Sequence, residues 1–285
     1  MKIQDSLEQA VQTLESRRVE SPRLSAELLM GAATSMSRAQ ILARPEYSLS
    51  HEESIRFLSM LYRRMKHEPI PYILGEVEFY SIPFFITPGV LIPRPETETL
   101  VDVALKLVQG MEVPKIYDLG TGCGNIIIAL ALNLEDGEFR ASDVSSAAIQ
   151  VAQRNVHRHA LENRVILREG ALFSPLRNEL AGGFDLIVSN PPYVKTSEIA
   201  KLSSQVKNFE PHSALDGGGD GMNIIKSLLD GAIPLLRSKG TVVFEADPDQ
   251  TTLIQNEVRR RTLYEECTVH QDATGRNRIF QVQRK

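Results

Sequence analysis

Short apolar runs alternate with segments of helical periodicity from residue 96 onward, and this alternation restricts the possible folds more than any other feature. Strands that alternate with helices form a parallel sheet covered on both faces. The sequence therefore predicts an α/β fold whose ligands bind beyond the carboxyl ends of the strands. We expect helices over 96–109, 124–134, 146–160, 221–237 and 248–261, and strands over 115–119, 139–143, 165–169, 184–190, 240–246, 263–270 and 278–283.

The first part of the chain shows helical patterns only. Apolar residues from Ile3 to Leu14 recur at three- and four-residue steps. Ser21-Pro22 places a capping residue before a proline at the first helical position. Ser37-Arg-Ala-Gln40 and Ser50-His-Glu-Glu53 both match the capping-box pattern. The sequence therefore predicts a small all-α domain over residues 1–74.

A segment of short strands follows the helices. Aromatic and β-branched residues between Val77 and Ile86 suit two short strands, and Pro83 suits a hairpin or a sheet edge. We expect a β-hairpin linker over 75–93 and a second domain over 94–285.

Composition excludes several classes of protein. The formal net charge is -4 and the sequence pI about 5.9, which argues against a nucleic-acid substrate. Cys123 and Cys267 lie far apart without metal-ligand spacing, so we expect no disulfide framework, no metal site and a cytoplasmic location. The N-terminus lacks a signal-peptide core, and no apolar run reaches the ~18 residues of a membrane span.

A glycine-rich turn follows the first strand of the alternating region. In KIYDLGTGCGN, Asp118 ends the strand, and Gly120, Gly122 and Gly124 can bring the backbone close to a ligand. The next strand ends on Asp143, where a carboxylate can accept hydrogen bonds from both ribose hydroxyls. A dinucleotide fold is the alternative, but its third glycine would stand at position 125, which is asparagine.

Asp118-Leu-Gly-Thr-Gly-Cys-Gly124 resembles the first motif of class I S-adenosylmethionine-dependent methyltransferases. The resemblance implies a Rossmann-like, seven-stranded, mostly parallel sheet whose last strand is antiparallel. It implies S-adenosyl-L-methionine as cofactor, with S-adenosyl-L-homocysteine as product. Asp118 and the turn of Gly120, Thr121, Gly122 and Gly124 would bind its methionine part, and Asp143 its ribose. Relatives usually carry an acidic residue where this chain has Ala171, so adenine would rely on backbone contacts and apolar packing, with Leu172 as a candidate.

Asn190-Pro191-Pro192-Tyr193 begins at the last residue of the expected strand FDLIVSN, residues 184–190. The prolines alone could serve only to stop the strand. In the methyltransferase interpretation, Asn190 also faces the methyl donor. Its side-chain oxygen and the Pro191 carbonyl would accept the two N–H bonds of a planar nitrogen, Pro192 would fix the backbone, and Tyr193 would offer a flat face. Methylases of adenine, cytosine, guanine and glutamine share this motif, so it predicts a planar nitrogen and no particular substrate.

Three further strings, LIPRPETETLV, NFEPHSALDGGGDGM and DATGRNR, closely resemble release-factor glutamine methyltransferases over essentially the whole chain. That family methylates the glutamine in the Gly-Gly-Gln loop of peptide chain release factors and so modulates translation termination. The resemblance implies that Arg94, Pro95, Glu96 and Thr97 border the pocket, that Glu210 and Pro211 shape a loop over it, and that the helical domain docks the release factor. Alternatives are a ribosomal-protein glutamine methyltransferase, a DNA adenine-N6 methylase, and a binding protein without catalysis.

Overall fold

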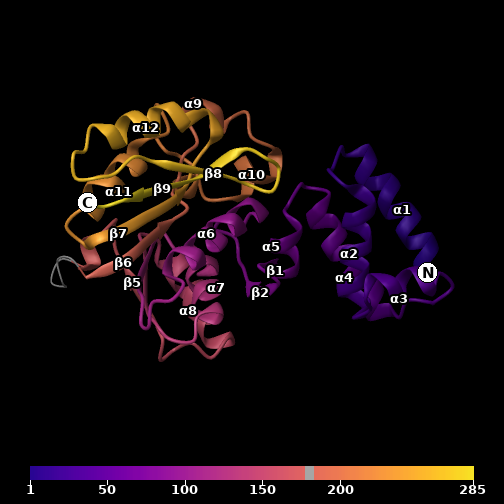
Figure 1. Ribbon diagram of the computed structural model, residues 1–285. Coiled ribbons are helices and arrows are strands. Elements are labelled where there is room, and N and C mark those ends of the chain that lie inside the picture. The colour runs from indigo at the N-terminus through magenta and orange to yellow at the C-terminus, as the bar shows by residue number, and fades with distance from the viewer. Residues whose placement is uncertain (177–182) are drawn as a thin grey trace. The chain divides into compact units, whose positions relative to one another are not determined.

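The computed structural model describes residues 1–176 and 183–285, which form two compact units (Figure 1). One unit holds Met1–Glu76 together with Ser203–Phe209. The other holds Val77–Leu202 and Glu210–Lys285. Among the described residues, no helix is long and apolar enough to cross a membrane.

The smaller unit is all-helical, as predicted. Its core is built from the apolar stripes of the helices, including Ile3, Leu7 and Leu14, which are each less than 5% exposed. Such a stripe stabilises a helix only by packing on another helix, so the helices of this unit depend on one another. They are α1 (Ile3–Ser16), α2 (Pro22–Thr34), α3 (Arg38–Ala43), α4 (His51–Arg64), α5 (Ile70–Leu74) and α10 (Ser204–Phe209).

Two of the three predicted N-terminal caps are confirmed. Ser37 and Ser50 each accept a hydrogen bond from the third residue of their helix and complete a capping box. The third was wrong in its detail: α2 begins at Pro22, but the Ser21 side chain makes no capping hydrogen bond. Ser21 has φ 49, in the left-handed region, whereas a capping side chain works from an extended backbone.

Helix α10 belongs to the helical unit although it is distant in sequence. Arg64 is 3% exposed, and its Nη1 donates to Gln205 Oε1 at 2.8 Å. The same guanidinium donates to Ser25 Oγ at 3.1 Å, and Gln205 donates to Glu20 Oε2 at 3.0 Å. The bonds of Arg64 give its buried guanidinium hydrogen-bond partners. A buried charge without partners would lower the stability of the fold.

The larger unit contains a seven-stranded sheet in the order β5-β4-β3-β6-β7-β9-β8. The pairs from β5 to β7 are parallel, and β9 is antiparallel to both of its neighbours. This arrangement confirms the predicted α/β class and the antiparallel last strand. The strands are β3 (Lys115–Leu119), β4 (Glu138–Asp143), β5 (Val165–Glu169), β6 (Phe184–Ser189), β7 (Leu236–Glu245), β8 (Thr268–Gln271) and β9 (Asn277–Gln283).

Helices cover both faces of this sheet (Figure 1). On one face lie α6 (Glu98–Val108), α7 (Asn125–Asn133) and α8 (Ser146–Arg158), and on the other α11 (Asn223–Ala232) and α12 (Thr251–Arg259). The remaining elements are the short helix α9 (Thr196–Ile199) and the single 3-10 turns η1 (Pro95–Thr97), η2 (Ser174–Leu176), η3 (His212–Ala214) and η4 (Pro248–Gln250).

The chain turns to opposite sides of the sheet after β3 and β6. From β3 it continues to β4 on one side, and from β6 it continues to β7 on the other. Such a switch point opens a crevice at the carboxyl ends of the two strands. The glycine-rich turn and Asn190 follow these two strands, so the fold brings both predicted motifs to one crevice.

The hairpin of β1 (Glu76–Phe79) and β2 (Ile82–Phe85) packs into the larger unit from Val77 onward. Tyr80 and Ser81 at its tip have φ 55 and 58, as in a type I′ turn. The Tyr80 N–H donates to Glu98 Oε1 at 2.8 Å, and its hydroxyl donates to Asp102 at 2.8 Å. These bonds hold the turn against α6.

Candidate active site

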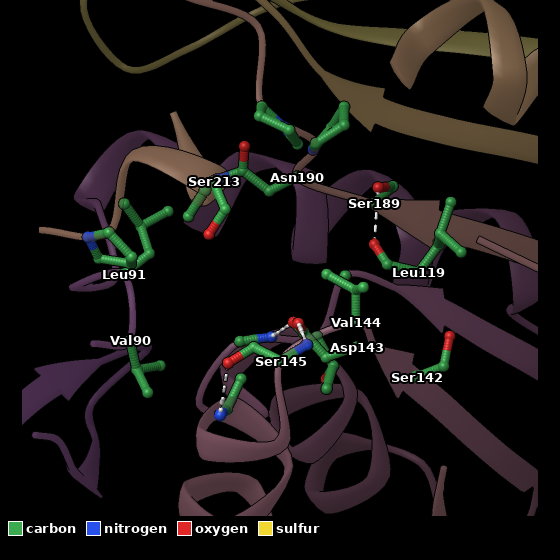
Figure 2. Close-up of a pocket in the computed structure, with 18 of the residues that line it drawn as sticks. Val90, Leu91, Leu119, Ser142, Asp143, Val144, Ser145, Ser189, Asn190 and Ser213 are labelled. Atoms are coloured by element: carbon green, nitrogen blue, oxygen red, sulfur yellow. Dashed lines mark hydrogen bonds between the residues drawn. The ribbon is translucent and has the colours of Figure 1, made fainter. Parts of the chain in front are cut away.

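A cavity of about 360 Å³ lies at the carboxyl ends of β3, β4 and β6 (Figure 2). Pockets of this size bind cofactors and drug-sized ligands. Asp143, Val144 and Ser145 lie on one side of it, and Asn190 and Ser213 lie across from them. The cavity is lined by both predicted strand-end motifs.

The glycine-rich turn has the conformation that its sequence predicts. Gly120 and Gly122 line the cavity with φ 74 and 57, values that an L side chain rarely adopts. The Gly122 N–H donates to Asp143 Oδ2 at 2.9 Å. The turn after β3 is thereby tied to the end of β4.

Asp118 lies behind this turn, fully buried, and does not line the cavity. Its Oδ2 accepts from Thr121 Oγ1 at 2.7 Å, and its Oδ1 has no hydrogen-bond partner among the described residues. Burial raises the pKa of Asp118 to about 7, and the nearby charge of Asp143 adds to the rise. A cationic group bound at the turn would stabilise the ionised form of this carboxyl.

Asp143 ends β4 and has both carboxylate oxygens anchored. Oδ1 accepts from the Ser145 N–H and Oδ2 from the Gly122 N–H, each at 2.9 Å. Burial raises the pKa of Asp143, opposed by these backbone bonds. Each carboxylate oxygen can accept a second hydrogen bond, so the anchored group can still bind ribose hydroxyls.

Apolar groups line the end of the cavity next to Asp143. Val144 is 64% exposed, although apolar side chains are usually buried, and Leu172 also lines the cavity. Ala171 lines it as well and has no side-chain acceptor for an adenine amino group. This end offers apolar packing to a flat base, and the predicted contact between Leu172 and adenine stays a prediction.

Asn190 is the first residue after β6, and Pro191 and Pro192 follow it along the cavity wall. The Asn190 Nδ2 donates to Thr97 Oγ1 at 3.1 Å, so its amide oxygen is not used in that bond. Tyr193 does not line the cavity. Its hydroxyl donates to Glu245 Oε1 at 2.9 Å, and its ring packs on the core beside α11 and α12. Its predicted role as a flat face for the substrate stays a prediction.

The segment IPRPETE reaches the same strand end. Thr97 and Pro211 line the cavity, whereas Arg94, Pro95, Glu96 and Glu210 do not. Arg94 donates to Glu210 Oε1 at 2.7 Å, which joins the two predicted loops by an ion pair. Glu210 is 4% exposed, and burial raises its pKa although Arg94 opposes the rise.

The glycine-rich segment 217–221 packs closely against the backbone of the NPPY motif and of Val194 after it. The Val194 N–H donates to Leu215 O at 2.9 Å, and the Gly217 N–H donates to Val194 O at 2.8 Å. A Cβ at Gly217 would lie 2.8 Å from the Pro192 carbonyl oxygen, and one at Gly221 would lie 2.3 Å from the Tyr193 carbonyl oxygen. The segment therefore supports the motif through close backbone contact.

Several cavity residues were missed by the sequence interpretation. Val144 and Ser145 follow β4 directly, so the rule that ligands bind at strand ends could have found them. Val90 and Leu91 come from the segment after the hairpin, and no local pattern places them at the crevice. The other missed residues are Gly89, Pro93, Leu119, Asn125, Ile126, Ser142, Ala148, Gly170, Ser189, Ser213, Ala214 and Ile224. Gly124 caps α7 and does not line the cavity.

The residues present fit S-adenosylmethionine. Asp118 has an unused buried oxygen among the described residues, behind a turn that can bind the cationic methionine part. Asp143 offers a carboxylate for the ribose, and Val144 and Leu172 offer apolar surface for the adenine. Each part of the cofactor therefore has a chemically matched group, either on the cavity wall or, for Asp118, directly behind the glycine-rich turn.

Comparisons with known proteins show which families this chain resembles. Residues 5–75 match the family described as PrmC N-terminal domain, and residues 97–265 match the family described as methyltransferase small domain. A release factor glutamine methyltransferase of Moorella thermoacetica is 39% identical, over 100% of this chain and 99% of its own length. One from Koribacter versatilis is 40% identical, over 87% of this chain and 89% of its own length.

Solved structures support the fold. The catalytic domain of hMettl16, in complex with a MAT2A 3'UTR hairpin, aligns with a TM-score of 0.58 over 82% of this chain and 81% of its own. Its sequence identity is 18%, so this likeness concerns the fold alone.

Proposed function

Because the chain belongs to the family of release factor glutamine methyltransferases, we propose that its target is the glutamine of the Gly-Gly-Gln loop of a peptide chain release factor. The enzyme transfers a methyl group from S-adenosyl-L-methionine to a glutamine side chain of release factors. The finer target, the loop glutamine, is the one that the sequence resemblance implies.

The observation that supports transfer to an amide nitrogen is the orientation of Asn190, and the family relationship supports the choice of a release factor. A glutamine amide nitrogen is a poor nucleophile because its lone pair is delocalised into the carbonyl. The Asn190 Nδ2 donates to Thr97, which leaves Oδ1 to accept one N–H of the substrate amide. The Pro191 carbonyl is the proposed acceptor of the second N–H. Both bonds would orient the nitrogen, and most of the catalysis would then be orientation.

The bound cofactor supplies a methyl group on a sulfonium, an already activated donor. The protein therefore needs no strong base, and the proton can leave the amide nitrogen late. Pro192 restricts the backbone that carries the Pro191 carbonyl. The segment 217–221 packs against the residues that follow, at the Pro192 carbonyl and the Tyr193 backbone. These contacts support the proposal that the site holds a planar nitrogen in a fixed direction.

We further propose that the helical domain over residues 1–74 binds the body of the release factor. Ile55, Leu58 and Tyr62 lie along α4 at helical spacing and are 54%, 50% and 58% exposed. An exposed apolar row of this kind often marks a protein-binding surface. Leu58→Glu should raise KM for the release factor several-fold and leave kcat within about twofold. Leu42→Glu, at an equally exposed leucine of α3, is the control, and an equal effect of both changes would contradict the assignment.

One experiment separates the candidate substrates. The enzyme is incubated with S-adenosylmethionine labelled in its methyl group and, separately, with a release factor, its Gly-Gly-Ala variant, a ribosomal protein and adenine-containing DNA. We expect label on the release factor and none on the Gly-Gly-Ala variant. Label on the Gly-Gly-Ala variant would refute the assignment of the loop glutamine as the target. Label on the ribosomal protein or the DNA alone would refute the assignment of a release factor as the substrate. The predicted cytoplasmic location stays a prediction.

A further inference from the structure

We propose that Glu245 is a positioning residue that acts through Thr97 to turn the side-chain oxygen of Asn190 toward the substrate amide. This inference rests on the proposed function and deepens it. Glu245 lies outside the cavity lining, whereas Asn190, whose side chain it orients, lies in it.

The sheet places Glu245 next to Asn190. Strands β6 and β7 are parallel, with Ser189 opposite Phe244. Asn190, the first residue after β6, and Glu245, the last residue of β7, therefore lie side by side. Glu245 is 1% exposed, and Thr97, from the turn η1, is also 1% exposed.

Hydrogen bonds connect these three side chains in one direction. The Thr97 hydroxyl donates to Glu245 Oε2 at 2.6 Å, and Asn190 Nδ2 donates to Thr97 Oγ1 at 3.1 Å. An ionised carboxylate is acceptor-only, and a hydroxyl has a single proton. Because Thr97 gives that proton to Glu245, it can only accept from Asn190. The Asn190 amide must then present its NH₂ to Thr97 and its oxygen to the cavity.

Tyr193 anchors the other oxygen of the same carboxylate. Its hydroxyl donates to Glu245 Oε1 at 2.9 Å, and burial, followed by the charge of Glu245, raises the pKa of Tyr193, so it stays a donor. The two ends of the NPPY motif are thus held by one carboxylate, directly at Tyr193 and through Thr97 at Asn190. A glutamine at 245 would have one acceptor oxygen where two hydroxyl donors need two.

The charged groups around Glu245 come from several elements. Burial raises the pKa of Glu245. The hydrogen bonds from Thr97 and Tyr193 and the positive charge of Arg278 on β9 oppose this rise. The negative charge of Glu96 of η1 adds to it. Arg94 also faces Tyr193. If Glu245 became protonated, it could donate to Thr97 and remove the constraint on Asn190. The rate should therefore fall as the pH falls through the raised pKa of Glu245.

The test measures methyl transfer to a release factor in four proteins: wild type, Thr97→Val, Thr97→Ser and Glu245→Gln. We expect Thr97→Val and Glu245→Gln to lower kcat at least ~10-fold, with KM for the release factor within about twofold. Thr97→Ser keeps the hydroxyl and should retain kcat within about threefold. The acidic limb of the wild-type pH profile should be absent in Glu245→Gln.

The outcomes separate this inference from the proposed function. Without label on the release factor in the wild type, the proposed function fails. With label in the wild type, normal kcat in Thr97→Val or an unchanged acidic limb in Glu245→Gln would overturn the role of Glu245. Thermal melting identifies a misfolded variant. If Thr97→Val is misfolded, the pH profile of Glu245→Gln decides. If Glu245→Gln is misfolded, kcat of Thr97→Val compared with Thr97→Ser decides.

Discussion

Replacing Gly217 with alanine tests whether the glycine-rich segment supports the catalytic backbone. A Cβ at this position would lie 2.8 Å from the Pro192 carbonyl oxygen and 2.8 Å from the Tyr193 Cα. Ordinary contact begins near 3.4 Å, so the two backbones must separate by about 0.6 Å. The segment cannot simply move away, because the Gly217 N–H and carbonyl are bonded to Val194 and Asn223.

This separation should cost both stability and catalysis. Overpacking of this size costs ~1–3 kcal/mol of stability. A misplacement of ~1 Å can lower a rate by ~100-fold, so about 0.6 Å at the NPPY backbone should lower kcat by on the order of tenfold. The affinity for S-adenosylmethionine should change little, because the groups that fit the cofactor follow β3 and β4.

Gly219→Ala is the matched control, since a Cβ at Gly219 meets no atom within 4 Å. Release-factor methylation gives kcat, and titration calorimetry gives the cofactor affinity. We expect a lower kcat in Gly217→Ala and a normal one in Gly219→Ala. Equal rates in the two variants would refute the supporting role of the segment.

Three other changes probe the rest of the molecule. Asp143→Ala should weaken S-adenosylmethionine binding at least ~10-fold by calorimetry, since it removes the ribose acceptors, and an unchanged affinity would contradict the ribose assignment. The pKa of Asp118 is about 7 in the folded protein, above its value in the unfolded chain. The free energy of unfolding should therefore fall as the pH rises from the unfolded pKa to about 7. Asp118→Asn should therefore raise Tm at pH ~8 and weaken cofactor binding; a lower Tm would argue against the buried charge. Ser37→Ala removes a capping box and should cost ~1 kcal/mol in urea unfolding, whereas Ser21→Ala, which removes no capping bond, should cost less.

The fold could be predicted because its signals are local. Alternation of apolar strands and helices predicted the sheet, and both capping boxes formed where their residues stand. Ser21 shows the limit of such signals. Its backbone took a left-handed conformation, which the serine-proline pattern does not reveal.

The main motifs of the site were also predictable, because parallel strands bring their carboxyl ends to one edge. The glycine turn after β3 and Asn190 after β6 meet at the crevice for that reason. The partners of Asn190 were not predictable. Thr97 and Glu245 lie 93 residues before and 55 residues after it. The register of β6 and β7 brings Glu245 beside Asn190, and the turn η1 brings Thr97 to both of them.

The membership of α10 in the helical unit had no sequence signal either. Gln205 belongs by sequence to the long loop after the NPPY motif, yet it bonds to Arg64 and Glu20 of the helical unit. Polar contacts between residues this far apart depend on the tertiary fold and leave no periodic pattern in the sequence.

The most direct test of the site is the rate of methyl transfer to a release factor by Asn190→Ala at saturating cofactor. Losing one preorganised acceptor should lower the rate by ~100-fold or more. Cofactor affinity, measured on the same protein by calorimetry, should stay within about twofold. A near-normal rate would contradict the central claim that the Asn190 oxygen orients the glutamine amide for methylation.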